Sequence, residues 1–336
     1  MSDGSYRVIS LFSGMGGMDL GFGGQVVVRP ESVPPTWERS PGPDGFVALA
    51  PLPYEVVFQN DILPEAQRIA TANGWACPAY HLTDIRTLQD DPTFVFPEAD
   101  VVVGGFPCQD FSHAGKRQGF TTARGTLYQA FVETVRRVQP KVFVAENVKG
   151  LLTMPGHPID IIKADMAAVG YRVHHHLLCA EDYGIPQTRH RVLIFGLRND
   201  LPIPEDWETP PAPHGRVSLR AYLGHLEEPS VSTDPAQQVF SRAARLERGQ
   251  GQTAVDMDGA GPTMRAEHHG NIEFRRHGDN ERRLTVREAA LIQTFPPTCI
   301  LTHTPRPSLV AYKPIGNAVP PLLGYIVAKK VLTVLA

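Results

Sequence analysis

Short apolar runs alternate with amphipathic segments through the first half of the chain. The runs that predict strands are residues 7–12, 54–59, 100–104 and 141–145. Residues 63–73 and 126–138 repeat their apolar positions with helical spacing. Strands that alternate with helices in this way are typical of βαβ units around a parallel sheet. We therefore expect an α/β fold for this part of the chain.

The regular pattern breaks at two places. Residues 29–53 contain seven prolines and few periodic apolar positions, which predicts a surface insertion. Between residues 199 and 261, prolines, glycines and polar residues dominate, which predicts a separate, loop-rich domain. Order returns at Thr285, which forms a capping-box pattern with Glu288 and so predicts the start of a helix. A last helix is expected over residues 320–335.

The size and composition indicate a globular protein of the cytoplasm. A chain of 336 residues is longer than most single cores, so we expect one large domain and a smaller one. No run approaches the ~18 apolar residues of a membrane span, and the N-terminus lacks the form of a signal peptide. The cysteines lie far apart with no C-x-x-C pair, which predicts reduced thiols and neither a disulfide framework nor a zinc site. They are Cys77, Cys108, Cys179 and Cys299.

The formal net charge of −3 gives no global sign of a nucleic-acid-binding protein. The distribution of the basic residues is more informative, because no lysine occurs between Lys163 and Lys313 while arginines recur throughout. The arginine fork matches phosphates and guanine edges better than the lysine ammonium does. A GC-rich genome that encodes arginine in place of lysine would give the same pattern. Both interpretations stay open, since acidic residues are interleaved.

Cys108 lies just beyond the strand predicted at residues 100–104, in the run GFPCQD at residues 105–110. Ligands of open α/β sheets bind outside the carboxyl ends of the strands, so a thiol at this position could reach a substrate. Free cysteines are more often small core residues, and position alone does not exclude that alternative.

A Gly-rich turn at residues 13–17 follows the first predicted strand. Such a turn suits a nucleotide-type cofactor, because glycines let the backbone approach the ligand. The G-x-G-x-x-G pattern is not met, so an NAD enzyme is not favoured. Asp61, at the end of the second strand, could bind ribose hydroxyls or cap a helix near Leu63.

Two further groups of polar residues flank predicted strands. Glu146 follows an apolar strand, where a partly desolvated carboxyl would have a raised pKa; the alternative is a surface loop glutamate. Arg189 and Arg191 lead into the strand predicted at residues 192–196, and their spacing places both side chains on one face. Such a face is either a solvated edge or a binding site for a polar base or a phosphate. Residues 174–176 are three histidines without carboxylate spacing, so we expect a solvated strand there and no metal.

Seven runs of the chain, in linear order, resemble the DNA (cytosine-5-)methyltransferase family of the bacterial type. The parts not covered by the resemblance are residues 29–53 and most of residues 199–261, and the family's target-recognition region falls in the second. The matching runs are residues 11–17; 105–109; 112 with 115–116 and 124–127; 146–149; 183–191; 283–296; and 312–313 with 316–319.

The resemblance implies a Rossmann-like S-adenosylmethionine-dependent methyltransferase sheet with a smaller loop-rich target-recognition domain. It places the catalytic and cofactor-binding domain at residues 1–198, completed by residues 312–336. The target-recognition domain is then expected at residues 199–281, and a hinge with a connecting helix at residues 282–311.

The resemblance also implies the reaction, which is sequence-specific methylation of cytosine C5 in DNA. Cys108 adds to C6 of a flipped cytosine, and Glu146 holds the N3 and amino edge of the base. Arg189 is expected on the base O2, and Arg191 on the loop or the nucleophile. The segment after Cys108 resembles the loop that closes over the base, and its expected DNA contacts are Gln109, Ser112, Lys116 and Arg124.

The implied cofactor is S-adenosylmethionine, converted to S-adenosylhomocysteine, with no metal. Asp61 and Ala318 depart from the family pattern, in which glutamate and serine are more usual, and the shorter Asp61 puts a bidentate ribose contact in doubt. The cofactor residues implied by the resemblance are Phe12, Gly14, Gly16, Asp61, Ile62, Asp84, Ile85, Pro107, Leu127, Asn317 and Ala318.

The expected partner is double-stranded DNA, with a cognate restriction endonuclease that acts separately as a further candidate. We expect a monomer in the prokaryotic cytoplasm, associated with the nucleoid through DNA. One alternative is an RNA (tRNA) cytosine-C5 methyltransferase of the same fold, against which the separate Pro- and Gly-rich segment argues. The other is a non-catalytic DNA-binding homologue. Three intact groups argue against it: Pro107-Cys108, Glu146-Asn147-Val148, and Gln187 with Arg189 and Arg191.

Overall fold

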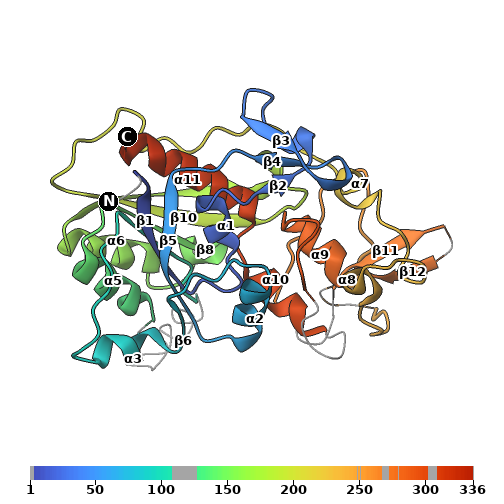
Figure 1. The fold of residues 1–336 in the computed structure, drawn as a ribbon, viewed down its shortest axis with the longest axis horizontal. Helices are drawn as coiled ribbons and strands as arrows, with labels where there is room; N and C mark the ends of the chain where they lie inside the picture. The colour runs from blue at the N-terminus through green and yellow to red at the C-terminus, as the bar shows by residue number, and fades with distance from the viewer. Residues whose placement is uncertain are drawn as a thin grey trace.

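The computed structural model describes residues 4–107, 127–247, 249, 251–266, 272–278, 280–301 and 309–335 (Figure 1). Its strands are β1 (Tyr6–Leu11), β2 (Val27–Val28), β3 (Arg39–Pro41), β4 (Val47–Leu49), β5 (Tyr54–Asp61), β6 (Tyr80–Leu82), β7 (Val101–Gly104), β8 (Val142–Val148), β9 (Tyr171–Cys179), β10 (His190–Arg198), β11 (Phe274–His277) and β12 (Asn280–Arg283). Its α-helices are α1 (Gly17–Phe22), α2 (Pro64–Ala72), α3 (Ile85–Asp90), α5 (Leu127–Val138), α6 (Pro158–Ala168), α7 (Leu219–Leu223), α8 (Pro235–Gln238), α9 (Val286–Ile292), α10 (Tyr312–Asn317) and α11 (Pro321–Leu335).

A seven-stranded sheet with the order β6-β5-β1-β7-β8-β10-β9 forms the centre of the molecule. The strands from β6 to β8 are parallel, and β10 runs antiparallel to both β8 and β9. The order places β1 next to β7, so the chain builds the sheet outward in both directions from this pair. The α/β class and the four predicted strands are therefore confirmed. β8 extends to Val148, three residues beyond its predicted end.

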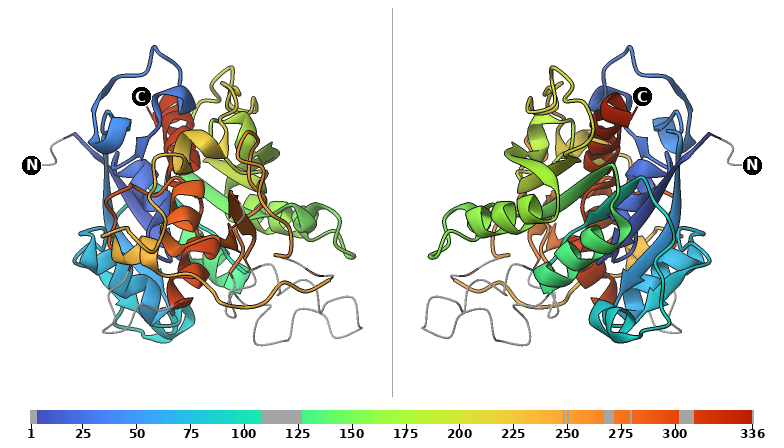
Figure 2. Two further views of the ribbon diagram at one scale, coloured as in Figure 1. Left: turned by 90° about the vertical axis from the view of Figure 1, so that its right-hand side faces the viewer. Right: turned by 90° about the vertical axis from the view of Figure 1, so that its left-hand side faces the viewer.

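Helices cover both faces of this sheet (Figures 1 and 2). On one face, side chains such as Val8 and Val144 pack against α1 and α11. On the other face, Ile9 and Phe143 pack against α3, α5 and α6. Adjacent residues of one strand point to opposite faces, so a strand buried on both sides reads as a continuous apolar run. This explains why the parallel strands are plain in the sequence.

Helices α1 and α11 touch through their glycines. A Cβ added at Gly21 would lie 2.2 Å from the backbone carbon of Gly324, and one added at Gly17 would lie 2.1 Å from the carbonyl oxygen of Val319. Neither position can carry a side chain without moving backbone. The Tyr6 hydroxyl donates to the carbonyl oxygen of Leu335 at 2.7 Å, so the first strand also contacts the end of α11.

Residues 29–53 lie largely at the surface, as predicted, but they also form ordered structure that packs against the rest of the protein. The segment contributes to a small sheet with the order β2-β4-β3, and Phe46 in it is 1% exposed. The buried Ser32 hydroxyl lies 2.7 Å from the Tyr222 hydroxyl, and the Tyr325 hydroxyl donates to Ala50. The prolines hid this packing, because they shorten the strands and so remove the periodic pattern. The segment joins α11 to the region around α7.

The short elements between residues 219 and 283 pack around α9. Thr285 and Glu288 form the predicted capping box, with reciprocal hydrogen bonds between side chain and backbone. Every residue of α9 is buried, and the short helices α7 and α8 and the hairpin β11–β12 lie beside it (Figure 1). Residues Leu309–Leu335 are long and apolar enough to cross a membrane, but 67% of their most apolar window is buried inside the protein.

The strand predicted at residues 174–176 is confirmed as part of β9, but its histidines are half-buried and not fully solvated. His174 stacks on Phe195 with a centroid distance of 5.2 Å and meets the edge of Trp207 at 4.7 Å. Burial lowers the pKa of His174 to about 3, and His176 and Lys330 add to the effect. The apolar cover comes from residues 195 and 207, which the local pattern around position 174 does not reveal.

Candidate active site

The carboxyl ends of β1, β5 and β7 lie side by side, where the strand order changes direction. This is the position at which open α/β sheets bind their ligands. The Gly-rich turn (residues 13–17) follows β1, Asp61 ends β5, and residues 105–107 leave β7. Cys108, Gln109, Ser112, Lys116 and Arg124 lie outside the described residues.

Glu146 is part of β8, where it continues the alternation of Val142 and Val144. Its carboxyl group is 7% exposed, and its Oε1 atom lies 2.6 Å from Nε of Arg191 on the neighbouring strand β10. The contact is an ion pair without the alignment of a hydrogen bond, because neither atom has a hydrogen-bond partner in the described chain. Both atoms are fully buried, so a ligand could reach them only if the ion pair moved apart.

The segment that leads to position 108 is held against β8. A Cβ added at Gly105 would lie 3.0 Å from Oε2 of Glu146, so a larger residue at position 105 would require the Glu146 carboxyl group to shift. The Asn147 amide donates to the carbonyl oxygen of Phe106 at 3.1 Å. Phe106 is buried and Pro107 is exposed. The chain thus emerges from the sheet directly beside the Glu146 carboxyl group.

Arg189 is 1% exposed and has no carboxylate partner among the described residues. Its guanidinium group donates to three carbonyl oxygens, those of Met264 at 2.9 Å, Gly316 at 3.1 Å and Ala318 at 3.0 Å. Burial lowers the pKa of Arg189 well below its usual value. The two arginines therefore have different partners. Arg191 contacts the Glu146 carboxylate, whereas Arg189 binds backbone carbonyl groups of segments far apart in the chain.

A buried amide pair extends this contact, and the sequence prediction missed it as a site feature. Gln187 donates to Gln293 at 2.7 Å and accepts from the Met264 amide at 2.8 Å. Gln293 in turn donates to the carbonyl oxygens of Ile315 and Ala318 at 2.6 and 3.1 Å. The only sequence signal was a glutamine two residues before Arg189. These bonds fix the segment before β10 to α9 and to the end of α10.

Asp61 joins the Gly-rich turn to the start of α2. Its Oδ2 accepts from the Gly14 amide at 2.7 Å and its Oδ1 accepts from the Leu63 amide at 2.8 Å. Burial raises the pKa of Asp61, and the hydrogen bonds from Leu63 and Gly14 oppose that effect. Gly14 and Gly16 have φ values of 56° and 90°, which favour glycine. The carboxylate thus holds the turn while retaining free lone pairs.

Asp19 lies in α1, directly after the same turn, and the sequence analysis did not identify it as a site residue. Its carboxyl group is buried and accepts from the Ser10 hydroxyl at 2.5 Å and from the Gln59 amide at 2.6 Å. Burial raises the pKa of Asp19 to about 6, although both hydrogen bonds oppose the shift. An aspartate within a short apolar helix was the available signal.

The other predicted cofactor residues differ in how accessible they are. Ile62 is 62% exposed beside Asp61, and Asn317 is exposed at the end of α10. Ile85 is 1% exposed and belongs to the hydrophobic core, so only its backbone could meet a ligand. Asp84 caps α3, and its pKa is lowered by hydrogen bonds from Arg86. The remaining three are Phe12, which has a φ of 54°, Leu127, which is half-buried, and Ala318, which is 8% exposed.

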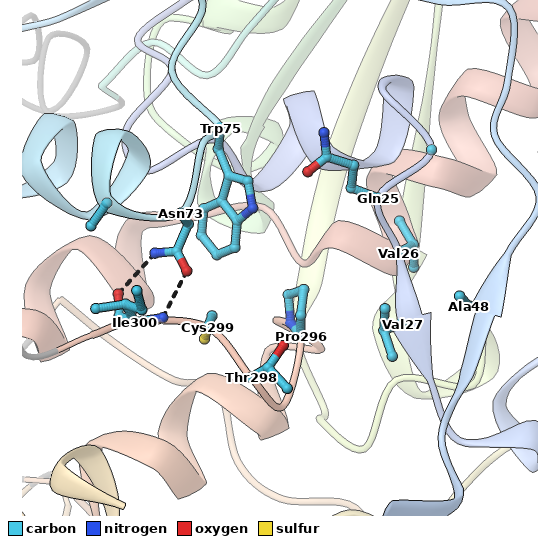
Figure 3. A pocket seen from close by; sticks show the side chains of 12 residues that line it. Gln25, Val26, Val27, Ala48, Asn73, Trp75, Pro296, Thr298, Cys299 and Ile300 are labelled. Atoms are coloured by element: carbon cyan, nitrogen blue, oxygen red, sulfur yellow. Dashed lines mark hydrogen bonds between the residues drawn. The ribbon is translucent and has the colours of Figure 1, made fainter. Parts of the chain in front are cut away.

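A separate pocket of about 400 Å³ lies between the end of α2 and the segment after α9 (Figure 3). Asn73 closes one side by pairing with both backbone groups of Ile300, at 2.8 and 2.7 Å. Trp75 lines the pocket and stacks on Phe295 at 5.8 Å. None of the predicted site residues lines it. Within the described residues, no group of three or more His, Cys, Asp or Glu side chains could hold a metal ion.

Comparisons with known proteins identify the family to which this chain is similar. The family model described as C-5 cytosine-specific DNA methylase matches residues 6–238 and 233–333. The type II methyltransferase M.BspRI of Lysinibacillus sphaericus is 34% identical over 354 residues, which cover 97% of this chain and 81% of that protein. M.BsuRI of Bacillus subtilis is 33% identical, over 97% and 79% of the two chains.

A solved structure shares the fold. The S. pombe Dnmt2 methyltransferase superposes with a TM-score of 0.68 at 18% sequence identity, and the match covers 98% of this chain and 99% of that one.

Proposed function

The chain belongs to the C-5 cytosine-specific DNA methylase family and is a sequence-specific DNA cytosine-C5 methyltransferase that uses S-adenosylmethionine, and on this basis we propose roles for its residues. We propose that Cys108 is the nucleophile and that Glu146 and Arg191 bind the target cytosine. The observation that carries this proposal is the position of the Glu146 carboxyl group, which lies against Gly105 where the chain leaves β7 towards Cys108.

The chemistry requires a nucleophile because C5 of cytosine is too electron-poor to attack a methyl group. The Cys108 thiolate adds to C6, which forms an S–C6 bond and shifts electron density to C5. When bound, S-adenosylmethionine supplies the electrophilic methyl group, and S-adenosylhomocysteine is the product. A base then removes the C5 proton, the S–C6 bond breaks, and Cys108 leaves as the thiolate. The target base must leave the duplex stack for this, at a cost of a few kcal/mol.

Glu146 is suited to the N3 and amino edge of the base. It is nearly buried, and water therefore competes weakly for its hydrogen bonds. We assign the contact with the base O2 to Arg191, because its guanidinium group is the one beside Glu146. O2 adjoins N3 on the cytosine ring, so neighbouring side chains can bind neighbouring atoms. We assign Arg189 a positioning role, since its donors are engaged by carbonyl groups.

The Gly-rich turn and its surroundings are suited to S-adenosylmethionine. The turn leaves backbone close to any ligand, and Asp61 combines lone pairs for ribose hydroxyls with the exposed apolar side chain of Ile62 beside it. Exposed apolar side chains of this size suit an adenine ring. We propose that Phe12, Asp84, Pro107, Leu127, Asn317 and Ala318 complete the site, with Ile85 acting through its backbone, and that no metal takes part.

The remaining roles follow the family pattern. We propose a target-recognition domain at residues 199–281, a hinge at 282–311, and a catalytic domain at 1–198 completed by 312–336. Gln109, Ser112, Lys116 and Arg124 are proposed to contact DNA. We also propose a monomer of the cytoplasm, with a restriction endonuclease that acts separately on the same DNA sequence.

A trapping experiment tests the nucleophile. In DNA that carries 5-fluorocytosine, the fluorine cannot leave as a proton does, so an enzyme that adds through sulfur stays bound to the base after methyl transfer. We expect a complex that survives denaturing electrophoresis for the natural protein and for Cys179→Ala. Cys108→Ala should give neither the complex nor methyl transfer, while still binding DNA and cofactor. Methyl transfer by Cys108→Ala would overturn the proposed mechanism.

A further inference from the structure

Most of the arginines between residues 199 and 301 form ion pairs within the protein. Between residues 199 and 301, almost every described arginine pairs with a carboxylate. These pairs are Arg216–Asp182, Arg220–Asp258, Arg245–Glu281, Arg265–Glu273, Arg275–Glu288, Arg276–Glu281, Arg282–Glu228 and Arg287–Asp234. Arg283 is buried and donates to backbone carbonyl oxygens. The interleaved acidic residues therefore neutralise most of the arginine-rich region.

Arg242 is the exception among the described arginines of this region. It is exposed, and none of the described residues forms a hydrogen bond or an ion pair with it. Its guanidinium carbon lies 4.1 Å from the centroid of the Phe240 ring, so the group lies over an aromatic face. Stacking of this kind orients the guanidinium plane without occupying its N–H donors. Arg242 thus presents a positioned and unused set of donors.

The surface under Arg242 is fixed to the core of the region. Phe240 forms a β-bridge with Thr285, the capping residue of α9, and the Val286 amide donates to Val239 at 2.9 Å. Arg282 approaches the same ring at 5.8 Å but is held by Glu228 and Glu288. The two arginines therefore share one aromatic ring, and only Arg242 is available to a ligand.

Arg242 also lines an open pocket of about 510 Å³. The pocket contains neutral hydrogen-bonding side chains, among them Ser230, Gln238 and Asn280. Its other charged residues are bound within the protein, and they are Glu228, Glu281, Arg282 and Arg283. An unpaired arginine beside neutral donors and acceptors can bind the edge of a nucleobase, and this contact would carry sequence information that a phosphate contact does not.

We infer that Arg242 is a specificity-determining residue, which reads one guanine of the DNA recognition sequence through its O6 and N7 acceptors. The fork of an arginine matches these two acceptors, and this pairing is the commonest specific contact in the major groove. The inference rests on DNA methylation by this chain and not on the roles proposed for Cys108 or Glu146.

The test compares the sequence preferences of variants. A plasmid library with randomised sites is methylated by the natural protein, Arg242→Gln, Arg242→Lys and Arg220→Gln, and the methylated cytosines are mapped by bisulfite sequencing. Arg220 is the matched control, because it is exposed and loses the same charge but pairs with Asp258. We expect both Arg242 variants to lose guanine preference at one position by about tenfold or more, with the other positions retained. Arg220→Gln should keep the natural preference.

Other outcomes would overturn the inference. If Arg242→Lys keeps the natural preference while Arg242→Gln methylates all sites more slowly, the residue contacts a phosphate. If both variants keep the natural preference, the residue does not meet DNA. Phe240→Leu is a second test, because it removes the aromatic surface but keeps the arginine; an unchanged guanine preference there would contradict the role of stacking. Loss of all methylation, as expected for Cys108→Ala, is a different result from relaxed specificity.

Discussion

Arg191 Nε lies 2.6 Å from Glu146 Oε1, across the antiparallel pair of β10 and β8. Leu193, and not Arg191, is the residue directly opposite Glu146, so the ion pair runs diagonally between the strands. A diagonal contact brings the two head groups together at the open end of the sheet, where a ligand can bind both. The charge of one also lowers the cost of burying the other.

Glu146→Gln keeps the shape of the side chain but removes its charge. We expect kcat to fall by about 10²- to 10⁴-fold, because a neutral amide cannot stabilise a protonated N3 in the transition state. DNA affinity should change by no more than a few fold. Single-turnover transfer of labelled methyl groups gives the rate, and a binding titration gives the affinity. A rate near that of the natural protein would show that another group assists at N3.

Conservative replacements should separate the two arginines. Arg191→Lys keeps the positive charge beside Glu146 but loses the fork, so kcat should drop more than tenfold while the free energy of unfolding changes by about 1 kcal/mol or less. Arg189→Lys should instead lower the free energy of unfolding by about 2–3 kcal/mol, because buried carbonyl groups lose their donors. Urea unfolding and methyl transfer measure the two effects. If Arg189→Lys lowered kcat without lowering the free energy of unfolding, and Arg191→Lys did the reverse, the base contact would belong to Arg189.

Asp61→Asn tests the link between the Gly-rich turn and cofactor binding. An amide cannot accept with both of its polar atoms, so the bond to Gly14 or the bond to Leu63 is lost. We expect the dissociation constant for S-adenosylmethionine to rise about tenfold, which corresponds to one hydrogen bond to a charged group. Calorimetric titration without DNA measures this constant. If the folded variant bound S-adenosylmethionine with an unchanged dissociation constant, Asp61 would not be part of the cofactor site.

His174 makes the stability of the protein depend on pH. Its pKa is about 3 in the folded chain against an ordinary value of 6.5. Between these values the unfolded chain binds a proton that the folded chain does not, so the free energy of unfolding falls as the pH drops. His174→Phe keeps a ring against Phe195 and Trp207 and removes this linkage. From pH 7 to pH 5, urea unfolding should show about 1 kcal/mol less loss for the variant, with solvent screening taken into account. Equal losses would contradict the assignment.

The sequence predicted best those helices and strands whose structure depends on residues close together in the chain. The strands buried on both faces and the capped helix α9 are visible because each depends on neighbouring residues. The small sheet that residues 29–53 help to form was not predicted, because it is held by partners far away in the chain, such as Tyr222 and Tyr325.

The same limit applies to the site. The sequence placed Arg189 and Arg191 together, but what separates them is that Arg189 binds carbonyl groups 75 and 127 residues further along the chain, at Met264 and Gly316. Likewise, nothing near Arg242 distinguishes it from its neighbours until their carboxylate partners are known. Pairing between remote residues decides which of several similar side chains is available for function.

The glycine contact between α1 and α11 also sets the order of events during synthesis. Roughly 300 residues separate Gly21 from Gly324, so a ribosome needs about 15–60 s to make the second helix after the first. Until then the side of α1 that carries Gly17 and Gly21 has no helix to pack against. The proposed cofactor site, which includes Asn317 and Ala318, is therefore completed only after residues 199–281 have been translated, and we expect a product truncated before α10 to contain the Gly-rich turn but to lack activity.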